Sequence, residues 1–109
     1  MREYRTFNET LKERLKNDPE EAQAYLEVAL EEFEENRDTA MLLKTLRYVA
    51  EAQGGIPTLA RKVGMNKQSL YKVFSDEGNP RLDTIGTILH GLGYRLALIP
   101  VEKEAIAAH

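Results

Sequence analysis

The residues best suited to chemistry are polar side chains between Asn66 and Lys72, because they can hydrogen-bond to the edges of DNA bases. Glutamine can bond adenine through two hydrogen bonds, and lysine can reach the acceptor atoms of guanine. The side chains expected to contact bases are Asn66, Lys67, Gln68, Ser69 and Tyr71. Asn66 also fits the N-cap of a helix, which would occupy part of its side chain. Tyr71 could pack on the sugar-phosphate backbone or simply support its helix.

A second group of side chains is better placed to contact phosphates, which set affinity and register rather than sequence preference. This group consists of Thr58, Arg61, Lys62, Lys72 and Ser75. Four cations and no acid lie between Arg61 and Ser75, although the whole chain has a net charge of −3. This stretch predicts a surface for double-stranded DNA. The alternative is that its lysines are only solvated.

Charge is divided unevenly along the chain. Residues 1–53 carry 8 Lys or Arg against 13 Asp or Glu, whereas residues 54–109 carry 7 against 5. An acidic half joined to a half with a basic patch indicates two different partners. The acidic candidates for docking a small basic protein are Glu27, Glu31, Glu34 and Glu35. They would share the outer side of one helix, and the alternative is an ordinary solvated helix surface.

Two short helices must position the base-contacting residues, one over about 57–64 and one over about 67–74. A steep crossing through a tight turn needs a small residue at the closest approach, a residue that tolerates positive φ, and an apolar seam. Seven residues occupy the offsets of a DNA-binding helix-turn-helix: Leu59, Ala60, Val63, Gly64, Met65, Leu70 and Val73. The pattern predicts such a motif, with the alternative that the pair serves packing alone.

Four further helices are expected, over 7–17, over 19–35, from Asp38 to Gly54, and from about Leu82 to Gly93. The last of these has an apolar side that is expected to face inward, formed by Leu82, Ile85, Ile88, Leu89 and Leu92. The predicted fold class is therefore all-α, with about six helices and one C-terminal β-strand. Its organisation is an acidic helical region over 1–53 packed on the same core, a DNA-binding region over 54–93, and a strand and tail over 94–109.

The predicted strand consists of Tyr94, Arg95, Leu96, Ala97, Leu98 and Ile99 and ends at Pro100. A lone strand with unpaired backbone groups is not stable in water, so its simplest partner is the same strand of a second copy. Such a homodimer would present two recognition helices to half-sites about 34 Å apart. The alternatives are a strand folded back on its own helices, or a disordered one.

Composition narrows the class of protein. With 109 residues, 42% apolar and 30% charged, the chain supports one compact core. It contains no cysteine, which excludes a disulfide framework and a thiolate zinc site and fits the cytoplasm. No apolar run is long enough to span a membrane. The chain has two histidines, no metal-ligand spacing and no phosphate-binding glycine loop. We therefore expect no enzymatic activity, no cofactor and no metal.

The chain resembles the antitoxin, or antidote, proteins of bacterial addiction modules of the host-inhibition-of-growth A type, which carry a Cro/lambda-repressor-like helix-turn-helix. The resemblance covers roughly residues 7–100, in the segments 24–30, 59–65, 69–72, 78–84 and 92–96. Its more specific pieces are Ser69-Leu70-Tyr71-Lys72 and Gly78-Asn79-Pro80. The recognition helix opens with Asn66-Lys67-Gln68 where the family would have an arginine and a glutamate, so the resemblance implies no particular operator sequence.

The resemblance implies two activities. Such proteins neutralise a small toxin, often a ribonuclease that cleaves messenger RNA, and they bind operator DNA to repress their own operon. We therefore expect a cytoplasmic, dimeric DNA-binding regulator that is also the antitoxin of a type II toxin-antitoxin module. The alternative is a stand-alone repressor of the same fold without a toxin partner.

Overall fold

The computed structural model describes residues 7–75 and 78–101, and these ranges contain six α-helices and no β-strand. The helices are α1 (Phe7–Asn17), α2 (Pro19–Asn36), α3 (Thr39–Ala52), α4 (Ile56–Val63), α5 (Lys67–Val73) and α6 (Leu82–Leu92). The expectation of an all-helical protein is confirmed. The predicted tail over 102–109 lies outside the described residues.

Local capping explains where several helices begin and end. The Asp18 side chain accepts a hydrogen bond from the Glu21 amide over 3.2 Å, and Pro19 follows it at the first helical position. Asp38 caps α3 in the same way, accepting from the Met41 amide over 3.1 Å. At the other end, α6 stops at Gly93, whose φ of 102° few other residues adopt.

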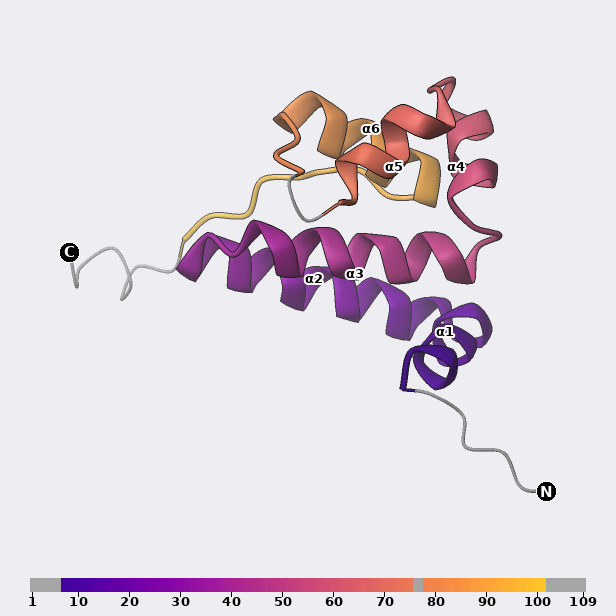
Figure 1. Ribbon diagram of the computed structural model, residues 1–109. Helices are drawn as coiled ribbons and strands as arrows, with labels where there is room; N and C mark the ends of the chain where they lie inside the picture. Colours follow the sequence, from indigo (N-terminus) through magenta and orange to yellow (C-terminus); the bar gives the residue numbers. More distant parts are fainter. Residues whose placement is uncertain (1–6, 76–77, 102–109) are drawn as a thin grey trace.

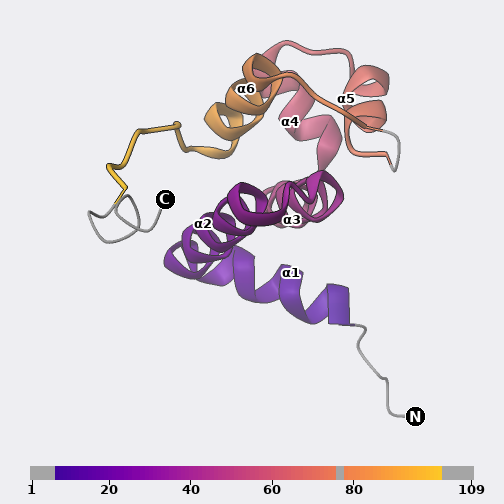
Figure 2. The same ribbon diagram turned by 90° about the vertical axis from the view of Figure 1, so that its left-hand side faces the viewer.

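The helix α3 lies at the centre of the molecule. The helices α1 and α2 pack on one side of it, and α4 and α6 pack on the other (Figure 1). The view turned by 90° shows the same order, with α1 and the group α4–α6 at opposite ends (Figure 2). The short helix α5 packs on α4. The N-terminal helices α1 and α2 and the helices around the basic stretch are therefore joined through α3.

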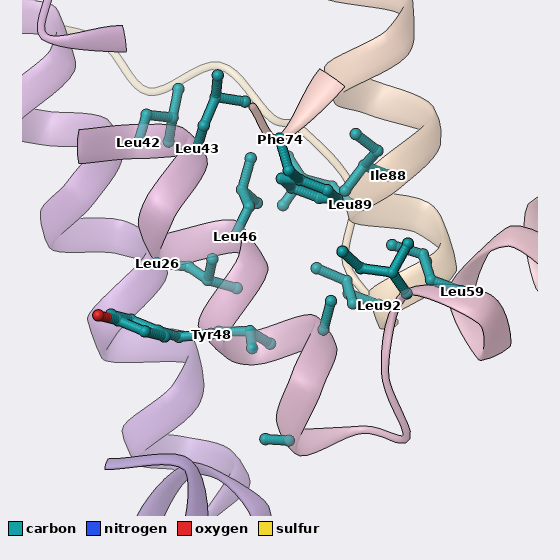
Figure 3. Packing of buried hydrophobic residues seen from close by; sticks show 14 of the residues in the cluster. Leu26, Leu42, Leu43, Leu46, Tyr48, Leu59, Phe74, Ile88, Leu89 and Leu92 are labelled. Atoms are coloured by element: carbon teal, nitrogen blue, oxygen red, sulfur yellow. The ribbon is translucent and has the colours of Figure 1, made fainter. Parts of the chain in front are cut away.

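One cluster of buried apolar side chains connects the two groups of helices. Leu46 and Val49 of α3, Leu70 of α5 and Ile88 of α6 are its most deeply buried large members, each less than 2% exposed. Figure 3 shows Leu46 between Leu26 of α2 and a group that includes Phe74. Burial of this kind supplies most of the stability of short helices, because they are marginal in isolation.

A glycine lets α6 lie close to α4. A Cβ atom at Gly91 would be 2.5 Å from Cγ1 of Val63 and 2.6 Å from Cδ1 of Leu59. The end of α6 is also tied to the end of α3, because the Gln53 side-chain amide donates to the Leu92 carbonyl over 2.9 Å. These contacts hold α4, and with it α5, against the rest of the protein.

The predicted C-terminal strand is wrong for this chain. After α6, residues 94–101 run as extended backbone without strand pairing, and the segment leaves the helices (Figure 1). Its beginning is held against the helices: the Tyr94 amide donates to the Leu89 carbonyl over 2.8 Å, the Tyr94 ring packs against the core, and Leu96 lies beside Gly86 of α6. The described part of the chain contains no neighbouring strand, so the backbone of residues 94–99 has no strand to pair with, despite the alternation of apolar and polar residues.

One residue that was expected on the buried side of α6, Leu82, is exposed instead. Ile85, Ile88, Leu89 and Leu92 are buried as predicted, but Leu82 is 74% exposed. Leu82 is the first residue of α6, at the end of the helix away from the buried Leu89 and Leu92. It therefore contributes to the surface instead.

Candidate functional site

The pair α4 and α5 meets at a tight turn that Gly64 makes possible. Gly64 has a φ of 72° and ends α4, and its amide donates to the Ala60 carbonyl. The Met65 amide donates to the same carbonyl over 3.0 Å. Leu59 and Ala60 are buried on α4, while Val63, Met65 and Val73 are half-buried against the core. The residues predicted to form the seam thus lie between the helix pair and the rest of the protein.

Asn66 begins α5 as its N-cap. Its side-chain oxygen accepts from the Gln68 amide over 2.7 Å and from the Ser69 amide over 3.3 Å. These bonds satisfy backbone donors that the first helical turn leaves unpaired. Of the two roles considered for Asn66, the structure therefore contains the capping role. Only the side-chain amide nitrogen of Asn66 remains available to hydrogen-bond to a base.

The two sides of α5 differ sharply in exposure. Leu70 is 0% exposed, and Phe74, directly after the helix, is 7% exposed. The side chains of Lys67, Gln68, Ser69, Tyr71 and Lys72 are all exposed. We call these five residues the outer face of α5. The predicted base contacts at 67–69 and 71 therefore share one accessible surface, and Lys72 lies on it too.

The predicted phosphate contacts comprise three exposed cations and two hydroxyls that donate within the protein, and the Arg61 guanidinium donates to the Thr58 hydroxyl over 3.3 Å. Arg61 and Lys62 are exposed in the last turn of α4, and Lys72 is exposed in the last turn of α5. The hydroxyl of Thr58 donates to the Gly54 carbonyl over 3.0 Å, and that of Ser75 donates to the Lys72 carbonyl over 2.7 Å. A hydroxyl has one hydrogen to give and phosphate oxygens only accept, so these two are poor phosphate ligands in this arrangement.

Arg81 is an exposed cation that sequence reasoning left out of the phosphate set. It occupies the N-cap position of α6, and its guanidinium lies 3.7 Å from the Asp83 carboxylate, with both side chains well exposed. A pair so open to solvent is weak, so Arg81 can exchange Asp83 for another anion. The signal that could have found it is a cation directly after Gly78-Asn79-Pro80, where the chain returns from α5.

A second charged surface lies on α2. Glu27, Glu31, Glu34 and Glu35 are all exposed, and α2 contains no Lys or Arg. Gln23 donates to the Glu27 carboxylate over 3.4 Å, which leaves the negative charge in place. Val28, among these acids, is 50% exposed. The helix therefore presents carboxylates with an apolar side chain between them.

Other chemistry has few candidates in the structure. Within residues 7–75 and 78–101, no group of three or more His, Cys, Asp or Glu is arranged to hold a metal ion. Burial, with the neighbouring Tyr48 as a second cause, raises the pKa of the Tyr25 hydroxyl, so this group stays neutral. Among the described helices, none is both long and apolar enough to cross a membrane.

The fold and site define a small all-helical protein with an exposed polar and cationic helix pair on one part of its surface and an acidic helix on another. A family model described as probable addiction module antidote protein matches residues 4–100, and the chain belongs to this family. Membership implies a toxin as partner, and the resemblance seen in the sequence is confirmed at this level. Neither the curated proteins nor the solved structures contain a significant match to the chain.

Proposed function

We propose that this protein is a DNA-binding transcriptional regulator and the antitoxin of a type II toxin-antitoxin module. In this proposal it is a cytoplasmic protein that neutralises a small ribonuclease-type toxin and represses its own operon. It catalyses no reaction. Membership in the antidote family supports the antitoxin part. The outer face of α5 carries the DNA-binding part, because its polar side chains are exposed beside the buried Leu70.

The helix pair suits the major groove of DNA. In a helix-turn-helix of the Cro/lambda-repressor type, the second helix enters the groove with its N-terminal residues toward the base edges. Here those residues are Lys67, Gln68 and Ser69, with the cations Arg61, Lys62 and Lys72 nearby in sequence. We propose that the first group reads bases and the second binds phosphates, with Tyr71 supporting base contact.

Gln68→Ala should lower the preference for one base pair of the operator. An adenine bound through two hydrogen bonds contributes about 1–3 kcal/mol of discrimination, which alanine cannot supply. The operator is first located by footprinting the DNA upstream of the gene, and affinities are then measured for all base pairs at each position. Gln23→Ala, an exposed glutamine on α2, is the matched control and should leave the preference unchanged. Identical preferences in both variants would remove Gln68 from the recognition surface.

Lys72→Ala should weaken binding to every DNA sequence by a similar factor. Each lost phosphate contact reduces the slope of log affinity against log salt by about one unit. Titrations with operator and unrelated duplexes at several salt concentrations measure this slope. Lys16→Ala removes an exposed lysine from α1 and serves as the control. A slope that Lys72→Ala leaves at the wild-type value would contradict the phosphate role.

The acidic outer side of α2 is the proposed docking surface for the toxin. A toxin that acts on RNA must be basic, and the four carboxylates would attract it and compete with its substrate. The double substitution Glu27→Lys/Glu31→Lys should slow association of the basic protein encoded beside this chain. We expect a decrease of roughly tenfold or more at low salt that shrinks as salt is added.

Glu9→Lys/Glu13→Lys is the matched control, because it makes the same charge change with the same spacing on α1. Equal association rates for both double variants would show that total charge matters and the α2 surface does not. Absence of any basic neighbour would favour a stand-alone repressor of the same fold. A homodimer is part of the proposal, because two-fold symmetric proteins bind two half-sites on DNA.

A further inference from the structure

Arg61 differs from three other arginines of the chain in the group that holds its guanidinium. Arg14, Arg47 and Arg81 each lie beside a carboxylate. Within the described residues Arg61 forms no ion pair, and its Nη2 atom donates to the Thr58 hydroxyl over 3.3 Å. A carboxylate offsets the charge of the arginine that it binds, whereas a neutral hydroxyl does not. Arg61 is therefore held without loss of its positive charge.

The Thr58 hydroxyl is fixed as an acceptor toward Arg61. Its hydrogen is donated to the Gly54 carbonyl over 3.0 Å, so the lone pairs of its oxygen remain to accept from the guanidinium. This oxygen lies close to the backbone of Gly54, where a Cβ atom would be only 3.1 Å from it. The Gly54 carbonyl thus sets the direction of the hydroxyl, and the hydroxyl sets the position of the Arg61 guanidinium.

The hydrogen bond draws the guanidinium back along α4. Arg61 lies in the last turn of this helix, and Thr58, three residues earlier, lies in its first turn. In a helix-turn-helix, the first helix crosses the DNA backbone. A guanidinium that lies along α4 therefore suits a phosphate of the strand that α4 would cross. The N–H groups that Thr58 leaves unused can bind two oxygens of that phosphate together.

We propose that Thr58 is a positioning residue for DNA binding, which holds the Arg61 guanidinium ready for a phosphate. An arginine side chain that is ordered beforehand loses less conformational freedom when it binds. The gain in affinity applies to every DNA sequence, because phosphates carry no sequence information. The inference rests on the proposed function, since Thr58 has this role only if Arg61 contacts DNA.

A double-mutant cycle tests the inference through the affinities for the operator duplex and for an unrelated duplex. Thr58→Val keeps the branched shape and removes the hydroxyl, so both affinities should fall about two- to tenfold. Thr58→Ser keeps the hydroxyl and should bind as the wild type does. In an Arg61→Ala background, Thr58→Val should have no effect, because the group that Thr58 positions is then absent.

Thr87→Val is the matched control for the lost hydroxyl. The Thr87 hydroxyl donates to the Asp83 carbonyl over 2.9 Å, a bond of the same kind as that of Thr58, and no arginine of the described ranges donates to it. This variant should therefore leave both affinities unchanged. Circular dichroism spectra of Thr58→Val and Thr87→Val should show the helix content of the wild type.

Side-chain order in the DNA-free protein gives a second measurement, by nuclear magnetic relaxation of the arginine Nε–H groups. The order parameter of Arg61 should exceed that of Arg95, an exposed arginine that forms no ion pair with any described residue. In Thr58→Val it should fall to the level of Arg95, because the guanidinium is then free to change rotamer.

Two results would overturn the inference while the proposed function stands. One is an equal loss of affinity from Thr58→Val with and without Arg61, because the effect would then not pass through the guanidinium. The other is a wild-type order parameter of Arg61 no higher than that of Arg95. An ordered Arg61 whose alanine variant binds all DNA as the wild type does would contradict the phosphate contact of the proposed function, and Thr58 would lose its role with it.

Discussion

Leu70→Ala should destabilise the protein by about 2–5 kcal/mol, the range found for large-to-small substitutions in well-packed cores. Leu70 is 0% exposed and is the buried residue of α5. The helix has only 7 residues, too few to be stable without packing. Loss of this side chain removes apolar contact and leaves a cavity between α5 and the core. Urea unfolding followed by circular dichroism measures the change.

The adjacent residue supplies the control for this experiment. Tyr71 is 40% exposed on the same helix, so Tyr71→Ala removes a larger side chain with less burial. Its effect on the free energy of unfolding should be clearly smaller. A cost for Leu70→Ala no greater than that of Tyr71→Ala would mean that α5 is not held by Leu70. On the proposed function, Leu70→Ala should also weaken operator binding, because the outer face of α5 would lose its support.

Gly78→Ala should be among the most damaging single-methyl changes in this chain. A Cβ at Gly78 would be 1.9 Å from the carbonyl oxygen of Val73 and 2.9 Å from the carbonyl carbon of that residue. Backbone atoms at the end of α5 cannot rotate away as a side chain can. The connection from α5 would have to move, and the hydrogen bond from the Gly78 amide to the Ser75 carbonyl, 2.9 Å long, would be lost. We expect a loss of about 1–3 kcal/mol in the free energy of unfolding.

Gly86→Ala is the matched control for the same methyl group. The nearest atom to a Cβ there is Cδ1 of Leu96, at 4.0 Å, which is an ordinary contact. Alanine also favours a helix over glycine by up to about 1 kcal/mol, so this variant should be as stable as the wild type or more so. Thermal unfolding of both variants compares the two sites. Equal melting temperatures would contradict the tight connection at Gly78.

Much of the helical structure follows from local patterns. Asp18, Asp38 and Asn66 cap α2, α3 and α5, because a capping side chain bonds amides only two or three residues away. Gly64 and Gly93 end helices for an equally local reason, their positive φ. The spacing of apolar residues likewise separates Leu70 from the exposed side chains around it. Such features need no knowledge of the rest of the chain.

Features that depend on distant partners were less predictable. The alternation over 94–99 indicates a strand, but a strand forms only where another strand supplies hydrogen bonds, and the described residues supply none. Leu82 fits the apolar side of α6 by spacing, yet lies beyond the core that would cover it. The engaged hydroxyls of Thr58 and Ser75 could not be foreseen, because their role depends on which carbonyl each one meets.

The amino-acid sequence alone determined the helices, their caps and the separation of an acidic from a cationic half, because these depend on neighbours along the chain. It also carried the similarity to antidote proteins. Only the tertiary structure decided that α3 joins both halves in one core, that the outer face of α5 stays uncovered, and that Leu96 lies beside Gly86. Each of these depends on contacts between residues far apart in the chain, which packing selects and local propensity does not encode.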